Sequence, residues 1–290
     1  MTNIIHTILS NNDCTTNYYK YIISIIKQIL DSTNKTISID YNNFKDDNIN
    51  IHINLEHTLV KQGGRGINTN AELSKIKYED MPYTIRITNE DSWKKSHIVI
   101  DYSMPNIINV EYSKDSNIIN KQVYIPPILY EFNPYSSGRE INILTTFLNI
   151  HEPRRFMLIN SLKKDNIPHE NINNCFSLED NHKLLKNTKV ILNIHQTDHH
   201  DTFEELRCLP ALLCGTIVIS EVSPLKEHIP YKDYIIWTSF DDINSTINDV
   251  LHNYEEYYNK LFINSGFKKL IESMREMSFK SLKDKIEYNG

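Results

Sequence analysis

The side chains best suited to chemistry lie in residues 189–221, KVILNIHQTDHHDTFEELRCLPALLCGTIVISE. This pattern predicts a buried strand, a loop rich in His and Asp, a helix that opens with acids and an arginine, and a second buried strand. Loops and helix N-termini that follow parallel strands gather at the carboxyl edge of a sheet, where ligands bind. We therefore expect a ligand site formed by the strand-end His195 and by Glu204, Glu205 and Arg207.

Helix chemistry alone gives a second interpretation of this segment. Thr202 and Glu205 have the spacing of a capping box, in which each side chain satisfies an amide at the start of the helix. Glu204 and Arg207 are i,i+3 neighbours and are able to pair on the helix surface. Either a ligand contact or a helix start accounts for these residue types.

The loop after the first of these strands carries five groups that are able to bind a metal: His195, Asp198, His199, His200 and Asp201. If the segment were helical, two of the histidines would share one face. An apolar strand runs directly into His195, so the segment is expected to be extended. An active-site loop, a solvated loop and a metal site are the three interpretations of this segment.

A pair of arginines marks a second candidate position in the same half of the chain. Arg154 and Arg155 follow Pro153, which suits the first position of a helix. Guanidinium groups beside helix N-terminal amides suit a phosphate, because both attract negative charge. Solvated arginines on the helix surface are the alternative, although a positive charge fits the first helical turn poorly.

The first half of the chain has weaker candidates. His57 follows a predicted strand and an acidic residue, so its imidazole is able to act as a general base, although structural histidines are commoner. Gly64 and Arg65 belong to a GGRG string whose amides and guanidinium suit a phosphate, without the spacing of a Walker loop. Asp101 and Tyr102 stand at a predicted strand end, where they either face a ligand or cap the strand before a turn.

The composition does not indicate a nucleic-acid partner. The 290 residues carry a net charge of −6, whereas a groove that follows many phosphates normally makes a domain strongly basic. The four cysteines have the spacing of neither a zinc knuckle nor a redox pair. No apolar run approaches the roughly 20 residues that span a bilayer, and no secretory leader is evident. We expect a soluble cytoplasmic protein, in the host cytoplasm if its source is viral.

Strands alternate with helices along most of the chain, which predicts an α/β fold with parallel, doubly wound sheets. The stretch 122–139, QVYIPPILYEFNPYSSGR, has the composition of a linker. We therefore expect a small N-terminal domain over residues 1–130 and a second domain over residues 131–265. Residues 266–290 are expected to form C-terminal helices that pack back across the domains.

Four motifs in the second half belong together: LNIH at 192–195, the Glu-x-x-Arg of Glu204 and Arg207, LLCG at 212–215, and VISE at 218–221. With these motifs, residues 140–240 resemble the nucleotide-sugar-binding half of GT-B-type glycosyltransferases. They are also similar to short glycosyltransferase-like proteins of bacteria and large viruses. The resemblance implies two facing Rossmann-like domains, of which the N-terminal one is small, and no catalytic metal.

The resemblance also implies a reaction. A sugar would pass from a UDP- or GDP-type nucleoside diphosphate sugar to the hydroxyl of a glycan or glycoconjugate acceptor, without a separate cofactor. Combined with the candidates above, the residues assigned to the donor are Arg154, Arg155, Arg207, Glu205, Glu221, Gly64 and Arg65. The residues assigned to catalysis are His57, His195 and Glu204.

One position departs from the pattern of the family. Many retaining members carry a Glu five residues before the glycine that corresponds to Gly215, and that Glu binds the donor ribose; here the residue is Pro210. Glu204, Glu205 and Glu221 are the remaining candidates for the ribose contact. The departure motivates a second hypothesis, a catalytically silent nucleotide- or glycan-binding protein on the same scaffold. A metal-dependent hydrolase that uses the His/Asp loop is the third.

Overall fold

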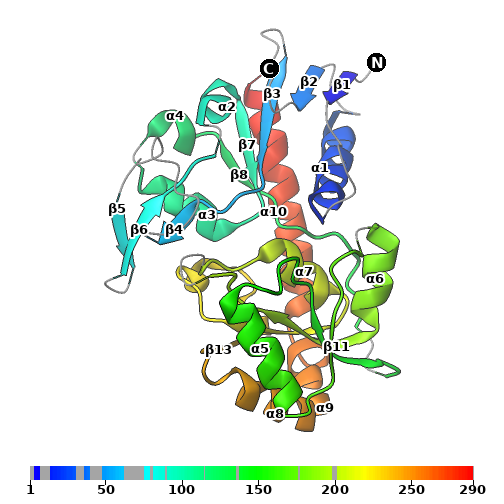
Figure 1. The fold of residues 1–290 in the computed structure, drawn as a ribbon. Helices are drawn as coiled ribbons and strands as arrows, with labels where there is room; N and C mark the ends of the chain where they lie inside the picture. The colour runs from blue at the N-terminus through cyan, green and yellow to red at the C-terminus, as the bar shows by residue number, and fades with distance from the viewer. Residues whose placement is uncertain are drawn as a thin grey trace. The chain divides into compact units, whose positions relative to one another are not determined.

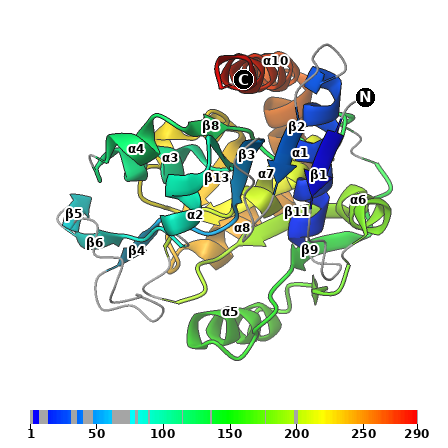
Figure 2. The ribbon, with the colours of Figure 1, turned by 90° about the horizontal axis from the view of Figure 1, so that it is seen from above.

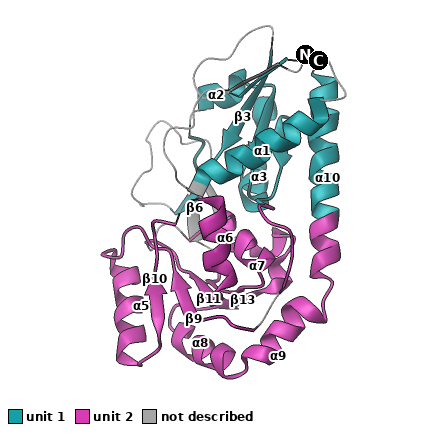
Figure 3. Cartoon of the chain, turned by 90° about the vertical axis from the view of Figure 1, so that its right-hand side faces the viewer, with its two compact units in different colours: residues 1–127, 273–290 teal, residues 128–272 magenta. Residues whose placement is uncertain are grey.

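The computed structural model describes residues 3–6, 14–30, 36–39, 48–61, 75–78, 81–88, 90–113, 115–134, 137–175, 177–197 and 201–289. The chain divides into two compact units (Figure 3). Unit 1 comprises Met1–Pro127 and Ser273–Gly290, and unit 2 comprises Ile128–Glu272. The division falls inside the proline-rich stretch, and the chain returns to unit 1 for its last segment.

The main sheet of unit 1 has five parallel strands in the order β1-β2-β3-β7-β8 (Figures 1 and 2). These strands are β1 (Asn3–His6), β2 (Thr36–Ile39), β3 (Ile49–Asn54), β7 (Ile98–Asp101) and β8 (Gln122–Tyr124). Every residue of β3 and β7 is buried, as expected for strands of a parallel sheet that is covered on both faces. The predicted α/β class with parallel sheets is confirmed.

Unit 1 also contains a small antiparallel sheet, ordered β4-β6-β5, which the alternation of strands and helices did not predict. Its strands are β4 (Leu59–Lys61), β5 (Lys75–Tyr78) and β6 (Met81–Ile85). The helices of unit 1 are α1 (Cys14–Leu30), α2 (Glu90–Lys95), α3 (Met104–Glu111), α4 (Ser116–Ile119) and the later part of α10 (Phe267–Tyr288).

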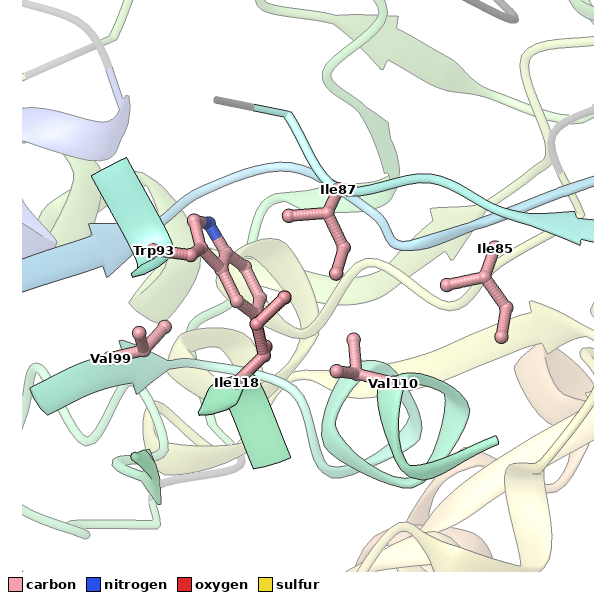
Figure 4. Close-up of a cluster of buried hydrophobic side chains, with 6 residues drawn as sticks. All are labelled: Ile85, Ile87, Trp93, Val99, Val110 and Ile118. Carbon is pink, nitrogen blue, oxygen red and sulfur yellow. The ribbon is translucent and has the colours of Figure 1, made fainter. Parts of the chain in front are cut away.

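Apolar spacing accounts for the helix packing in unit 1. In α1, Tyr18, Ile22, Ile26 and Ile29 recur every three or four residues and are all buried, so one stripe of the helix faces the core. A further core cluster gathers around a buried tryptophan (Figure 4). Its members are Ile85, Ile87, Trp93, Val99, Val110 and Ile118.

Unit 2 has a second five-stranded parallel sheet, in the order β10-β9-β11-β12-β13. Its strands are β9 (Ile141–Thr145), β10 (His169–Asn171), β11 (Thr188–Asn193), β12 (Ile217–Glu221) and β13 (Ile235–Thr238). Its helical elements are α5 (Pro153–Lys164), α6 (Leu178–Lys186), α7 (Glu205–Leu213), η1 (Lys226–His228), η2 (Lys232–Tyr234), α8 (Ile243–His252), α9 (Tyr254–Tyr258), η3 (Asn259–Ile263) and the start of α10.

The buried Arg139 forms hydrogen bonds with the segments of unit 2 that lead into β11 and β12. Arg139 donates hydrogen bonds to the carbonyl oxygens of Leu185 (3.1 Å), Thr188 and Cys214 (2.6 Å). Leu185 and Cys214 lie at the ends of α6 and α7, where the last carbonyls have no acceptor role within the helix, and Thr188 begins β11. Gly215 follows with φ +70, and a Cβ atom there would lie 3.0 Å from Nη2 of the same arginine.

Among the residues that the structure describes, no helix has the length and apolar character needed to cross a bilayer.

Candidate functional site

The carboxyl edge of the unit 2 sheet brings polar side chains of two strands together. Asn193 ends β11 and lies in register with Ser220 of β12, to whose hydroxyl its amide donates at 3.0 Å. Arg207 of α7 donates from Nη1 to Oδ1 of Asn193 at 2.9 Å. The helix guanidinium is therefore held over the strand end by a hydrogen bond that spans the loop.

Arg155 supplies a second guanidinium near this edge. Its side chain is only 7% exposed, and its guanidinium carbon lies 4.6 Å from the ring centroid of Phe147. Its Nε is buried and has no hydrogen-bond acceptor among the described residues. Burial, and then the positive charge of Arg207, lower the pKa of Arg155 to about 10, whereas Glu152 and Glu204 oppose the shift. Arg207 is thus close enough to act on Arg155, and the desolvated guanidinium of Arg155 carries an N–H that attracts an acceptor.

Arg154 is placed differently from its neighbour. Its guanidinium forms an ion pair with Glu221 and lies over the ring of Phe240, 4.3 Å from the centroid. Glu221 is 4% exposed, and its second oxygen accepts the backbone N–H of His195 at 2.8 Å. The positive charge of Arg154 is thus offset inside the protein, and Glu221 holds together α5, β12 and the segment after β11.

His195 is buried two residues beyond the end of β11, close to the position that the strand pattern predicts. Its Nε2 lies 3.3 Å from the hydroxyl of Ser223, and its Nδ1 lies 3.7 Å from a carboxylate oxygen of Glu221. Within the described parts of the chain, no three His, Cys, Asp or Glu side chains are grouped as metal ligands. Asp198, His199 and His200 lie outside the described residues.

The two glutamates at the start of α7 have different surroundings. The predicted capping box is wrong, because α7 begins at Glu205 and its N-cap is Glu204, not Thr202. Glu205 is fully buried and accepts a hydrogen bond from the hydroxyl of Tyr231 at 2.8 Å. Glu204 is half-buried and close enough to Arg155 to raise its pKa. Glu204 therefore borders the arginine pair, whereas Glu205 supports the packing of α7.

In unit 1, His57 follows β3 in a short loop. Its Nδ1 lies 3.4 Å from the hydroxyl of Tyr102, and the two share a hydrogen bond. Its backbone carbonyl accepts from Nη2 of Arg86 at 3.1 Å, and the same guanidinium pairs with Glu56 at 3.3 Å. The imidazole is thus oriented by one neighbour, and its main chain is fixed by another.

Asp101 organises the floor of this loop. Its carboxylate accepts the amide N–H groups of Asn54 (2.7 Å) and Asn106 (3.1 Å) and the backbone N–H of Ser103 (2.9 Å). Burial raises the pKa of Asp101 to about 6, although these hydrogen bonds and the charge of His57 act to lower it. The cap interpretation of Asp101 accounts for its bond to Ser103. Its pairing with Asn54 follows from the parallel register of β3 and β7.

Gly64 and Arg65, the other two candidates for the donor site, lie outside the described residues. Their role in the donor site stays a prediction.

The chain is similar to a viral protein in sequence and to solved structures in fold. No protein-family model matches the chain. An uncharacterized protein of Acanthamoeba polyphaga mimivirus is 34% identical over 169 residues, which are 57% of this chain and 56% of the relative. The match thus spans about half the length of that relative.

Two of the similar solved structures are of TarM, and one of these is a mutant from S. aureus in complex with fondaparinux, alpha-GlcNAc-glycerol and UDP. Their sequence identities to this chain are 11% and 13%, and their TM-scores are 0.42 and 0.43. The alignments cover 95% and 94% of this chain and 57% of each TarM chain.

Proposed function

We propose that this protein is a glycosyltransferase that moves a sugar from a nucleoside diphosphate sugar to an acceptor hydroxyl. The observation that carries the proposal is the buried guanidinium of Arg155, which has an unpaired Nε and lies near Arg207 at the carboxyl edge of a parallel sheet. Negative charge develops on the diphosphate as the glycosidic bond breaks. Preorganised donors in a desolvated site stabilise that charge strongly.

The mutual electrostatics of the two arginines support an anionic ligand. Without an anion, the two like charges repel, and the pKa of Arg155 is lowered by that repulsion as well as by burial. A diphosphate between them would remove the repulsion and accept from both guanidinium groups. The twelve-residue helix α5 begins beside Arg155, and its N-cap Glu152 makes no side-chain cap hydrogen bond. The helix N-terminus therefore adds a favourable dipole.

The surroundings of the acids favour one of the three ribose candidates. Glu205 is fully buried against Tyr231, and Glu221 accepts from Arg154 and from the amide of His195. We assign the donor ribose to Glu204, which borders the arginine pair. Glu221 then acts as a positioning residue for His195, which would orient the donor sugar.

In unit 1, we assign His57 as the general base toward the acceptor hydroxyl. Tyr102 fixes the orientation of its imidazole, and the Asp101 cluster holds the adjacent loop. The donor base, UDP or GDP, and a glycan acceptor remain parts of the proposal. No separate cofactor is proposed.

Arg155→Ala and Arg207→Ala test the anion site directly. Each change removes charge-assisted hydrogen bonds worth about 1.5–3 kcal/mol, so the Kd for UDP or GDP should rise by roughly tenfold or more. Isothermal titration calorimetry measures the Kd, and release of labelled sugar from UDP- and GDP-sugars measures turnover. Lys163→Ala, at an exposed position of α5, serves as the charge-matched control and should leave both unchanged. An Arg155→Ala protein with wild-type affinity for both nucleotides would reject the proposal.

The silent binding protein remains the second candidate, and one observation favours it. Pro210 is buried inside α7, so the position at which retaining relatives carry a carboxylate offers no acceptor for ribose. The same titrations separate the two candidates. Nucleotide binding with neither donor hydrolysis nor transfer over a panel of UDP- and GDP-sugars and glycan acceptors would favour the silent protein.

A further inference from the structure

A concave site lies at the edge of the unit 2 sheet opposite Arg155 and Arg207. It is a pocket of about 510 Å³, formed where the chain enters β9 and β11 and where α8 passes into α9. Its lining includes Ser137, Arg139, Lys189, Tyr254, Glu255 and Glu256. Lys189 is at the amino end of β11, four residues before Asn193, which contacts Arg207. At about 3.3 Å per residue, the two sites are separated by roughly 13 Å of strand.

Two donors in this pocket have no acceptor. The hydroxyl of Tyr254 is buried without a hydrogen-bond partner in the described part of the chain, and the side chain is 7% exposed. Burial raises the pKa of this hydroxyl, which therefore remains a neutral donor. The ammonium group of Lys189 lies 5.7 Å from the centroid of the same ring. The described carboxylates include none within ion-pair distance of Lys189.

Arg139 forms part of the pocket wall, but its N–H groups are not available to a ligand. Its guanidinium donates to the main-chain oxygens of Leu185, Thr188 and Cys214, so its donors are occupied by the protein. Lys189 is therefore the cation left to select a ligand. A carboxylate or phosphate that binds the ammonium group of Lys189 would lie beside the ring of Tyr254, whose buried O–H lacks an acceptor among the described residues.

The other polar residues that line the pocket restrict the kinds of ligand that fit it. Glu255 and Glu256 are exposed carboxylates at this pocket, and Ser137 adds a hydroxyl. Carboxylates accept hydrogen bonds from hydroxyls and repel ligands that carry many negative charges. The volume falls within the range of small-molecule sites and exceeds what one inorganic ion fills. We propose that this pocket binds a small ligand that combines one anionic group with several hydroxyls: a sugar acid or a sugar phosphate.

Four probes test the ligand class by isothermal titration calorimetry on the full chain. Glucuronate carries the carboxylate, glucose 6-phosphate carries the phosphate, glucose lacks the charge, and inorganic phosphate lacks the hydroxyls. We expect binding of glucuronate, glucose 6-phosphate or both, with at least tenfold weaker binding of glucose and of inorganic phosphate. Which of the two acids binds identifies the source of the anion. Equal binding of glucose and of the acids, or binding of neither acid, would overturn the proposal.

Two variants test whether the pocket is the site. Lys189→Ala and Tyr254→Phe should each raise the Kd of the bound acid by roughly tenfold. Tyr254→Phe removes a hydroxyl that makes no hydrogen bond, so this variant should fold at least as stably as the wild type. Lys260→Ala, outside the pocket lining, is the control for lost surface charge. An unchanged Kd in the phenylalanine variant, with its fold verified by circular dichroism, would contradict the assignment.

Measurements of the affinity for UDP and GDP distinguish ligand binding in this pocket from ligand binding at the carboxyl edge of the sheet. Lys189→Ala should leave nucleotide binding unchanged, whereas Arg155→Ala should leave binding of the acid unchanged. In amide NMR spectra, the acid should shift the signals of Lys189 and Tyr254 and leave that of Arg207 in place. Shifts confined to Arg207 would place the acid at the other edge and reject the pocket. The inference does not depend on the glycosyltransferase proposal.

Discussion

At the scale of single residues, Asp101 is a carboxyl group in surroundings that disfavour its charge. It is fully buried at the end of β7, and the pKa of its side chain is raised from 3.8 to about 6. The protonated form is therefore favoured by folding. Stability from this group is present at low pH and is lost as the pH rises from about 4 to about 6, because the unfolded chain ionises first.

Replacement of Asp101 by Asn should remove this pH dependence. The free energy of unfolding of the wild type, minus that of Asp101→Asn, should fall by on the order of 3 kcal/mol between pH 4 and pH 7 and change little above pH 7. Trp93 reports on unit 1, so urea unfolding followed by fluorescence in a Trp237→Phe background measures the difference. Glu111→Gln, on an exposed acid of α3, is the control. A difference that increases with pH would show that Asp101 is stabilised as the anion.

The sequence predicted His195 near a strand end, but it did not predict Asn193 and Ser220 there or the partners of these side chains. His195 was expected at the end of a rigid strand, and it is buried two residues beyond the end of β11. The bond between Arg207 and Asn193 depends on how α7 lies over β11, and no motif encodes that geometry. Glu205 and Tyr231 are separated by 26 residues and meet only through the packing of the loop after β12.

At the scale of elements, the turn from α7 into β12 depends on Gly215. Its φ of +70 lies in the left-handed region, and a Cβ atom would come within 2.7 Å of the hydroxyl of Tyr258 and 3.0 Å of Arg139. Gly138 has a similar φ of +76, but its surroundings are open. A comparison of alanine substitutions at the two glycines therefore distinguishes the cost of backbone strain from the cost of crowding.

Gly215→Ala should destabilise unit 2 more than Gly138→Ala does. Left-handed strain costs each variant about 1–2 kcal/mol, and the crowding at Gly215 adds roughly 1–3 kcal/mol by analogy with overpacked cores. Hydrogen–deuterium exchange of the β11 and β12 amides measures the loss. If both variants protect these amides equally, contact with Tyr258 and Arg139 is not what requires a glycine at this turn.

Elements of regular pattern were predictable, and irregular ones were not. The runs of β-branched residues in β11 and β12 and their intervening helix predicted a parallel pair. The antiparallel β4 and β5 are only three and four residues long, too short to show a period. Arg139 was included in a predicted linker because its acceptors are main-chain carbonyls, which leave no trace in the sequence.

At the scale of the whole molecule, the last helix belongs to both units. The first residues of α10 belong to unit 2, and residues from Ser273 belong to unit 1 (Figure 3). Leu282 and Ile286 are fully buried, and the ammonium group of Lys285 donates to the carbonyl of Asn120 at 2.5 Å. Unit 1 thus draws part of its core from the far end of the sequence.

The double change Leu282→Ala and Ile286→Ala should destabilise unit 1 selectively. Each truncation of a buried aliphatic side chain costs about 2–5 kcal/mol. Hydrogen–deuterium exchange should therefore increase in β3 and β7 and change little in β11. Asp284→Ala, at an exposed position of the same helix, is the control. Equal loss of protection in both sheets would mean that the two units unfold as one.

The discontinuity of unit 1 also bears on how the chain folds during translation. Nascent domains usually fold in the order of synthesis, at ~5–20 residues per second. Here the interior segment 128–272 is complete before the first 127 residues receive their missing helix. The early strands must therefore stay unfinished on the ribosome for on the order of 10 s. During that interval the apolar surfaces of these strands are exposed on the nascent chain, where a chaperone is able to bind them.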